Sequence, residues 1–593
     1  MKNITHHPVP HLRTLKFIAA AALALPSLSH AASIALATAP LATSTTSSVK
    51  PNVMFILDDS TSMEWNYLPD WAGNYKNDPA LHRNSNFNGV AYNPAITYTQ
   101  PVYYNADGSL NTTTYPSQTG TSTATGADTA VATPNWRKVR DDAYGIQSTS
   151  TSNLEGNAYF YTFIPGEYCS SAKMNDCVTA SAPTTVGGVA YDKPAYVRWC
   201  SDTALTTCQS INNTTYKYPR YPGPATATIK VTNSTTTNTV TQITVNGKNI
   251  MSGAATGSST ESVTATNIMN KINDCTAAAT GSCTVAGFSA TVSSTTVTIY
   301  APSSMGAITY TPAKSGGAST TITAFKGYVP GSNLRTDIVS GTNSYPYPGS
   351  ASKASTRTDC AGTTCTYKEE MTNYANWWAY YQTRMQAMKT SVSRAFKSLD
   401  NRFRVGYTTI SSTNATDGTK FLGNNTFELT HKNTWFNRLF AADTRDSSGG
   451  VQYTPLRGAL SKAGRYYGNK ITGQSDPVQY SCQQNFTILS TDGYWNSDDE
   501  TSTYKALNLT GGAIGNMDGG TTPRPMKEGT TAVSDTLADI AKYYYDTDLR
   551  TSTLSNCAGG TSTDFPSGNP DVCTNNVFTS STDNNIKQHM TTF

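Results

Sequence analysis

The clearest pattern in the chain is a set of short apolar runs, each followed at once by polar residues. Val53–Leu57 is the first run, and its unbroken apolar character is typical of a central parallel strand that is buried on both faces. Arg402–Ile410 and Phe486–Gly493 predict two further strands. Strands of this kind with helices between them predict an α/β fold with an open, doubly wound, Rossmann-like sheet.

Helical periodicity lies between these strands. Glu369–Leu399 carries apolar and aromatic residues mostly at three- and four-residue steps, which predicts one long helix with a face that packs on the sheet. Its aromatic stripe is interpreted as core rather than as a binding surface. Further helices are expected at Asn433–Ala442, at a segment that starts with Thr454 and Pro455, and from Ser534, a candidate N-cap.

A long segment separates the first strand from the helix that should follow it. Residues 64–366 therefore predict a very large, mostly β insertion beside the expected ligand site. Within residues 64–224, which are rich in Tyr, Pro and Asn, the aromatic residues of Phe87–Tyr98 are expected to pack a disulfide-clipped subdomain, with carbohydrate binding as the alternative. Residues 225–326 predict a small α+β module, and 327–366 a linker.

The segments on both sides of the insertion, 51–63 and 367–593, are expected to form one discontinuous α/β domain. Residues 1–31 have a positive start, a short apolar run and a small-residue cleavage site, which is typical of a secretory signal peptide. An Ala/Thr/Ser-rich leader, 32–50, follows. The apolar run is too short to cross a bilayer as a helix and no later stretch is longer, so no transmembrane segment is expected.

Composition narrows the compartment and the partners. The 593-residue chain has a net charge of +4 and 14% charged residues. This charge does not create the strong positive potential that would attract nucleic acid. Its 11 cysteines fit an oxidising compartment. Cys482 is left over from five local pairs that the spacing suggests, namely Cys169–Cys177, Cys200–Cys208, Cys275–Cys283, Cys360–Cys365 and Cys557–Cys573. No pair has the CxxC spacing with a neighbouring His that favours zinc.

The polar residues after the first strand carry the candidate chemistry. Asp58, Ser60 and Ser62 form the pattern Asp-x-Ser-x-Ser, so that one carboxylate and two hydroxyls on a tight loop can point at one centre. Hard oxygen ligands of this kind suit Mg²⁺ or Mn²⁺, with Ca²⁺ as a further possibility. Asp59 is expected to shape the loop rather than to touch the ion.

Two distant segments strengthen this interpretation. Thr454 at a helix start and Asp492 after the third strand resemble, together with the Asp-x-Ser-x-Ser loop, the metal-ion-dependent adhesion site of von Willebrand factor A domains. The resemblance implies that Asp492 reaches the ion through water and that the sixth position is open to a partner's carboxylate. The implied ligands are Asp58, Ser60, Ser62, Thr454 and Asp492. A domain of this fold whose site holds no ion is the alternative.

Six segments in order resemble the PilY/PilC family of type IV pilus-associated proteins, and they read LDDSTSM, NYANWWAYYQTRM, TPLRGAL, LSTDGYW, LADIAKYYYDTDLR and QHMTTF. The resemblance covers residues 51–63 and 367–593. It implies an exported protein of the periplasm or outer surface, found at the pilus tip, that promotes pilus assembly, opposes retraction and mediates adhesion. The family's C-terminal β-propeller half is expected to be absent from this sequence, and the α/β domain is expected to be a fragment that stops before its last strand and helix.

Several functions follow from these observations. The leading hypothesis is a non-enzymatic pilus biogenesis factor and adhesin, with minor pilins and a host or surface ligand that carries an acidic group as partners. A structural tip or priming scaffold of the pilus and a secreted adhesin unrelated to pili are the alternatives. An enzyme is not expected, because Asp498, Asp499 and Glu500 are interpreted as a solvated loop and no Gly-x-Ser-x-Gly nucleophile elbow lies beside the histidines.

Overall fold

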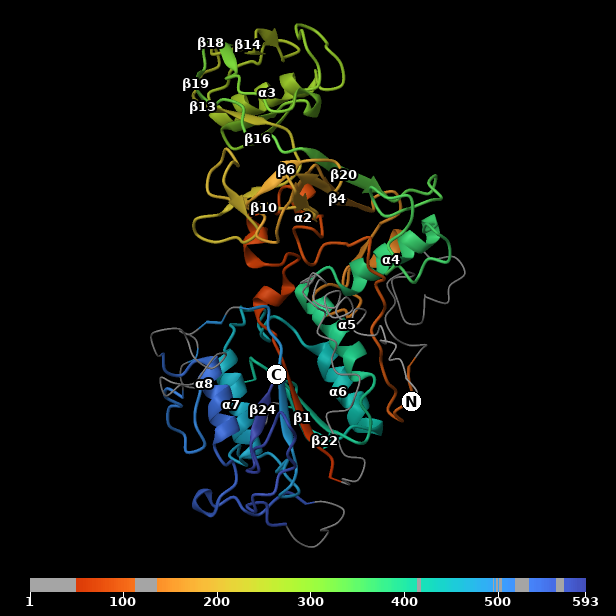
Figure 1. The fold of residues 1–593 in the computed structure, drawn as a ribbon, viewed down its shortest axis with the longest axis vertical. Coiled ribbons are helices and arrows are strands. Elements are labelled where there is room, and N and C mark those ends of the chain that lie inside the picture. Colours follow the sequence, from red (N-terminus) through yellow and green to blue (C-terminus); the bar gives the residue numbers. More distant parts are fainter. Residues whose placement is uncertain are drawn as a thin grey trace, which may run out of the picture.

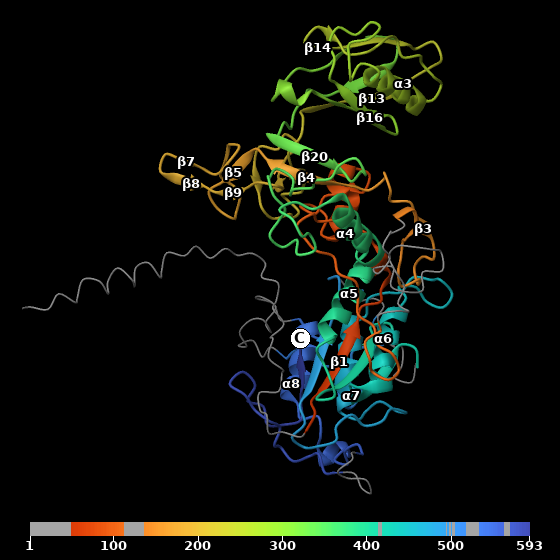
Figure 2. The same ribbon diagram turned by 90° about the vertical axis from the view of Figure 1, so that its right-hand side faces the viewer.

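A computed structural model of the chain describes residues 49–111, 136–412, 418–493, 495–496, 500, 504–517, 533–561 and 570–593. Figures 1 and 2 show an elongated molecule with an α/β domain at one end, a middle region, and a small module at the far end. The predicted signal peptide and nearly all of the leader lie outside the described residues. None of the helices in the described ranges has the length and hydropathy that crossing a membrane requires.

The sheet of the α/β domain has five strands in the order β22-β21-β1-β23-β24. β1 (Asn52–Leu57) lies at the centre and pairs in parallel with β21 (Arg404–Thr409) and β23 (Asn485–Leu489). β24 (Met590–Thr592) continues the parallel part, whereas β22 (Phe421–Thr426) is antiparallel at the other edge. All six residues of β1 are buried, as its apolar run predicted. The fold is therefore mixed α/β with a largely parallel, open sheet.

Helices cover both faces of this sheet. α5 (Arg384–Phe396) and α6 (Leu429–Ala441) contribute to the core on one face, and α7 (Leu456–Tyr467) and α8 (Leu537–Asp546) to the core on the other. Alternate residues of β1 enter the two cores, since successive side chains of a strand point to opposite faces. Figure 1 shows these two helical layers on either side of the strands.

The prediction of a single long helix at Glu369–Leu399 is wrong. Two helices occupy this segment, α4 (Tyr367–Tyr380) and α5, and Thr383 begins the second one through a capping box with Gln386. The aromatic side chains of α4 pack in the core of the insertion, whereas the apolar side chains of α5, which include Phe396, pack on the sheet. The periodic pattern continued across the break because the three intervening residues correspond to nearly one helical turn.

Two other helix starts differ in detail from the sequence prediction. α6 begins at Leu429, four residues before the expected Asn433. Ser534 is not the N-cap of α8, because Thr536 accepts from the backbone N–H of Asp539 and the Asp539 carboxylate accepts in return from the N–H of Thr536. These two hydrogen bonds form a capping box. Ser534 cannot form one, because the residue three positions after it is Leu537.

The insertion has a middle region and a distal module. In the middle region β4 (Tyr159–Pro165) pairs with β20 (Gly331–Asp337), which lies in the segment expected to be a linker. The chain enters this region from the loop after β1 through η1 (Thr61–Glu64). The other elements of the region include η2 (Asp70–Tyr75), α2 (Pro79–His82), β2 (Val139–Arg140), β3 (Thr151–Ser152), β5 (Glu167–Cys169), β6 (Cys177–Thr179), β7 (Thr184–Val186), β8 (Val189–Tyr191), β9 (Lys193–Pro194), β10 (Arg198–Cys200), β11 (Cys208–Gln209) and β12 (Tyr218–Arg220).

The distal module has strands on both sides of one helix in the chain order, as the alternating segments predicted. It contains β13 (Thr226–Asn233), β14 (Val240–Val245), β15 (Lys248–Asn249), α3 (Glu261–Asn273), β16 (Ser289–Ser293), β17 (Thr296–Tyr300), β18 (Ala313–Gly316) and β19 (Ser319–Ile322). Its own apolar core includes Ile229, Ile268 and Ile299, all completely buried. The module therefore packs around a core separate from those of the sheet.

The disulfide prediction is confirmed, because all five expected pairs are bonded. Cys482 is free and half-buried. The aromatic residues of the segment 87–98 form core, since Phe87, Tyr92 and Tyr98 are 5%, 1% and 8% exposed. The packing interpretation of this segment therefore holds over the carbohydrate alternative.

Lys389 on α5 is a buried cation. Its Nζ donates to the carbonyl oxygens of Phe440 at 2.9 Å and Ala442 at 2.7 Å, and burial lowers its pKa to about 8. Because the unfolded chain keeps this lysine protonated up to about pH 10, the unfolded state binds more protons above pH 8. Stability must therefore rise with pH in that interval.

We expect the free energy of unfolding of the wild type, relative to a Lys389→Met variant, to increase by about 2 kcal/mol between pH 8 and pH 10. Urea unfolding of both proteins over this range measures the difference, and contributions from the buried tyrosines cancel in it. Parallel pH profiles for the two proteins would contradict the prediction.

Candidate metal centre

Two neighbouring parallel strands end at the same edge of the sheet and place the first and last predicted ligands side by side. The backbone N–H of Asp58 donates to Ser490 Oγ at 3.3 Å, and the N–H of Ser490 donates to the carbonyl oxygen of Ile56 at 3.0 Å. Asp492 follows Ser490 by two residues, and its charge acts on the Asp58 carboxyl. The structure therefore brings Asp58 and Asp492 to one place, although 434 positions separate them in the chain.

The Asp-x-Ser-x-Ser loop forms a compact network of oxygens. Asp58 Oδ1 accepts from the backbone N–H of Ser60 at 2.9 Å and from Ser60 Oγ at 2.6 Å. Ser60 Oγ lies 3.1 Å from Ser62 Oγ. Asp58 and Ser60 are buried, whereas Ser62 is partly exposed. One carboxylate and two hydroxyls thus converge at the point where β1 ends.

Thr454 reaches this edge from the segment before α7. Two residues earlier, the Gln452 carbonyl accepts from the N–H of Thr61 at 3.0 Å, and the N–H of Gln452 donates to Thr61 Oγ1 at 2.9 Å. The Gln452 side chain also donates to the carbonyl oxygen of Asp59 at 3.1 Å. Thr454 itself is 5% exposed, and Asn496 holds its backbone through two hydrogen bonds. Thr454 is therefore fixed next to the Asp-x-Ser-x-Ser loop.

Asp492 is held by an arginine that the sequence patterns did not indicate. Its Oδ2 accepts from Arg384 Nη1 at 2.6 Å, and Arg384 Nη2 donates to Asp70 Oδ1 at 2.7 Å. The guanidinium also lies over the rings of Trp65 and Tyr67, and the Arg384 side chain is 3% exposed. Since 108 positions separate Arg384 from Asp492, no local motif contains the pair.

Asp59 makes its contacts on a different side. Its carboxylate accepts from the backbone N–H of Ser411 at 3.1 Å and from the Ser411 hydroxyl, and Lys420 Nζ lies 3.6 Å away. Ser411 follows β21, so that Asp59 ties the loop after β1 to the loop after β21. This is the structural role expected for Asp59.

The Asp58 carboxylate is incompletely satisfied by protein groups. Its Oδ2 is buried and has no hydrogen-bond partner in the part of the chain that the structure describes. Burial, with a smaller contribution from the negative charge of Asp492, raises the pKa of Asp58 to about 6, although hydrogen bonds from Ser60 and a weaker interaction with the Thr491 side chain oppose this shift. A buried carboxylate oxygen without a donor, next to two hydroxyls, fits a hard divalent cation such as Mg²⁺, Mn²⁺ or Ca²⁺.

Two other groups of potential metal ligands are weaker candidates for a metal site than the Asp58 loop. Cys557, Asp571 and Cys573 lie close together, but the two sulfurs form a disulfide and so provide no thiolate. Asp498 and Asp499 lie outside the described residues. Glu500, which was interpreted as solvated, is instead 6% exposed, pairs with the Arg457 side chain and accepts from the backbone N–H groups of Arg457 and Gly458. Its carboxylate therefore stabilises the first turn of α7.

Three relatives show what the chain is similar to. It is 31% identical over 257 residues to the type IV pilus biogenesis factor PilY1 of Pseudomonas aeruginosa strain PAO1, which covers 39% of this chain and 20% of that protein. The PilY1 protein of strain UCBPP-PA14 is 31% identical to the chain over a match that covers 35% of the chain and 18% of that protein. The PilY1 protein of strain PAK is 32% identical over 30% of the chain and 16% of that protein. The chain thus spans about a fifth of the length of the curated relatives it matches. No family model and no solved structure matches it.

Proposed function

We propose that this chain, whose matches support membership in a PilY1-like family, serves type IV pilus biogenesis and adhesion as an exported, pilus-associated protein. The name of its relatives supports the pilus role, and its five disulfides are consistent with export because such bonds persist in oxidising compartments. Minor pilins are the first partners that this role implies.

We further propose that the α/β domain is of the von Willebrand factor A type and that its strand-end site binds a divalent cation, Mg²⁺ or Mn²⁺ in the first place. The observation that carries this proposal is the buried, unpaired Oδ2 of Asp58 beside the hydroxyls of Ser60 and Ser62. Thr454 would complete the direct ligands, and Asp492 would act through water. When bound, the ion supplies an electrophilic position that accepts a carboxylate oxygen from a partner.

A structural scaffold at the pilus tip is the second candidate. The ion pair between Arg384 and Asp492 favours it, because this contact stabilises the site loops without any metal. Removal of the metal separates the two functions. An adhesive site loses its partner when the ion is removed, whereas a scaffold retains it.

We expect binding of purified minor pilins to the immobilised full chain to be at least tenfold stronger in Mg²⁺ than in EDTA. Ser62→Ala should remove this difference, since it deletes one oxygen of the site. Ser448→Ala is the control, because it removes a serine hydroxyl from an exposed Asp-x-Ser turn, in which Ser448 Oγ donates to Asp446 Oδ1 at 2.6 Å as Ser60 Oγ donates to Asp58. Equal binding with and without the chelator would favour the scaffold.

A further inference from the structure

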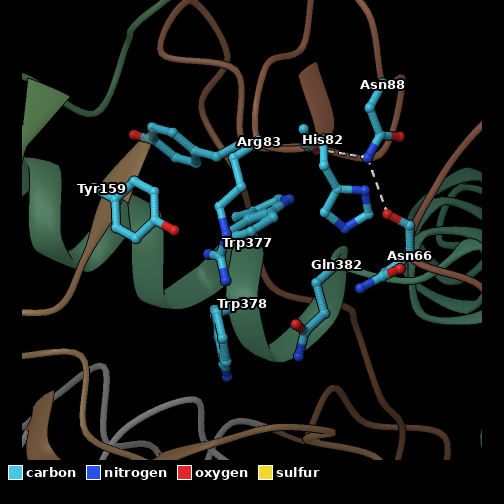
Figure 3. Close-up of a pocket in the computed structure, with 10 residues that line it drawn as sticks. Asn66, His82, Arg83, Asn88, Tyr159, Trp377, Trp378 and Gln382 are labelled. Carbon is cyan, nitrogen blue, oxygen red and sulfur yellow. Dashed lines mark hydrogen bonds between the residues drawn. The ribbon is translucent and has the colours of Figure 1, made fainter. Parts of the chain in front are cut away.

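A second candidate site lies in the middle region, where the insertion meets α4. It is a cavity of about 90 Å³, lined by residues of the segment after η1, of the segment around α2, of β4 and of α4 (Figure 3). None of the lining residues is acidic, although Arg83 and His82 are among them. The cavity is therefore a pocket with a cationic wall and no carboxylate to balance it.

Arg83 is the centre of this wall. Its guanidinium carbon lies 4.9 Å from the centroid of the Tyr159 ring and 5.8 Å from that of Trp378. Figure 3 shows the side chain running past the Tyr159 ring and ending near Trp378. Nη1 donates to the Tyr374 hydroxyl at 3.3 Å, and no ion pair joins Arg83 to a carboxylate of the described residues. Since a guanidinium has five N–H donors, most of them are available to a ligand.

The neighbour of Arg83 in the chain adds unmet hydrogen-bonding capacity to the wall of the cavity. His82 Nδ1 is buried and has no hydrogen-bond partner among the described residues. Burial, together with the charges of Arg83 and Lys76, lowers the pKa of His82. A second guanidinium, that of Arg335, lies 4.1 Å from the centroid of the same Tyr159 ring, but its charge is already paired with Asp337, so that, within the described part of the chain, Arg83 alone supplies the free positive charge of the site. An anionic group is the ligand that such a site attracts.

The size of the cavity limits that group. A cavity needs about 10–15 Å³ on this scale to hold a single water, so that about 90 Å³ admits a small group of a few heavy atoms. A carboxylate at the end of a short methylene chain has this size, whereas a sugar acid with its ring and hydroxyls is larger. The planar guanidinium matches a carboxylate through two parallel hydrogen bonds, and the flanking aromatic rings provide apolar surface for the methylenes.

We propose that this cavity binds the side-chain carboxylate of a glutamate presented by a protein partner, with Arg83 as the residue that recognises the charge. This site needs no metal, so that it is independent of the centre at Asp58. A partner with two acidic groups would engage both places, which adds affinity without enlarging either site.

The test uses the full chain in EDTA, which removes any contribution of the metal centre. The probes are N-acetylglutamate α-amide and its neutral counterpart N-acetylglutamine α-amide, and binding is followed by saturation-transfer NMR and calorimetry. We expect saturable binding of the glutamate probe and at least tenfold weaker binding of the glutamine probe. Arg83→Gln should weaken binding of the glutamate probe at least tenfold.

Arg335→Gln is the matched control. Arg335 contacts the same tyrosine ring but is exposed and paired with Asp337, so this variant should bind the glutamate probe as the wild type does. Equal affinity for the two probes, or unchanged affinity in Arg83→Gln, would overturn the proposal. Tighter binding of D-glucuronate than of the glutamate probe would overturn the assignment to a protein partner. If Arg83→Gln fails to fold, the comparison of the two probes on the wild type decides the question.

Discussion

Asp58→Asn is expected to lower the affinity of the chain for Mg²⁺ by at least about a hundredfold. Loss of residues that only support a metal ligand costs about 10–100-fold, and this substitution removes the charge of a direct ligand. The amide keeps the shape of the carboxylate and an oxygen that can accept the two bonds from Ser60. Calorimetric titration of the full chain with Mg²⁺ and with Mn²⁺ measures the loss.

The same substitution should stabilise the chain when no metal is present. The folded-state pKa of Asp58, about 6, lies above that of an unfolded aspartate. The folded state therefore binds more protons than the unfolded chain between about pH 4 and 6. Above pH 6 the folded state bears the full free-energy cost of burying the ionised carboxylate. In EDTA at pH 7 we expect Asp58→Asn to raise the free energy of unfolding by about 1–3 kcal/mol.

Asp446→Asn is the control for both measurements. Asp446 Oδ1 accepts from the backbone N–H and the hydroxyl of Ser448 at 2.9 and 2.6 Å, as Asp58 does from Ser60, but this turn is exposed. Asp446→Asn should therefore change neither the Mg²⁺ affinity nor the free energy of unfolding by a significant amount. Wild-type Mg²⁺ affinity in Asp58→Asn would remove this residue from the ligand set.

The comparison of these turns shows what the sequence motif specifies. Asp107 and Ser109 repeat the same two hydrogen bonds a third time, again at the surface. The Asp-x-Ser geometry is therefore a local property of the backbone and is not specific for a metal. Asp58 differs because it follows the fully buried β1, where a partner strand places Ser490 beside it. The apolar run before the motif thus carried most of the information.

Features with a short range in the sequence were predictable. The five disulfides close loops between neighbouring cysteines, and the strands β1 and β23 are short, mostly apolar runs with polar residues after them. The break between α4 and α5 was missed because both helices are amphipathic and the spacing across the break nearly preserves the phase. Only the packing shows that the aromatic face of α4 belongs to the core of the insertion.

Contacts across the chain were not predictable from patterns. Gln452 joins the segment of Thr454 to the loop of Asp58, yet nothing in its local sequence marks it. Arg83 lies in no motif, and Arg384 lies in the segment NYANWWAYYQTRM, which does not indicate its partners, so the roles of both follow from what surrounds them. In both cases aromatic rings frame a guanidinium. Arg384 forms ion pairs with two carboxylates, whereas Arg83 forms none with the described residues.

Arg384→Gln is expected to lower the free energy of unfolding in EDTA by about 3–5 kcal/mol, which is the usual effect of removing one partner from a buried ion pair. The substitution leaves Asp492, whose side chain is 7% exposed, without its guanidinium. Mg²⁺ should restore more stability to this variant than it adds to the wild type. The ion would then supply the positive charge that the arginine provided, and a ligand that binds only the folded state stabilises it.

Thermal unfolding in EDTA and over a Mg²⁺ series measures both effects. Arg384→Lys keeps the charge and should lie between the wild type and Arg384→Gln. Arg402→Gln, which breaks an exposed pair with Asp400, should change stability by less than about 1 kcal/mol in either condition. An equal Mg²⁺ shift in the wild type and in Arg384→Gln would show that Asp492 does not act on the ion.

The double variant Asp58→Asn, Arg384→Gln decides whether this rescue takes place at the proposed centre. If the ion binds between the loops of Asp58 and Asp492, the double variant should remain less stable than Asp58→Asn alone, and Mg²⁺ should not restore that loss. A rescue that persists would place the ion elsewhere. Arg384 would then only join the insertion to the sheet through Asp70 and Asp492, which is the contact that the scaffold function requires.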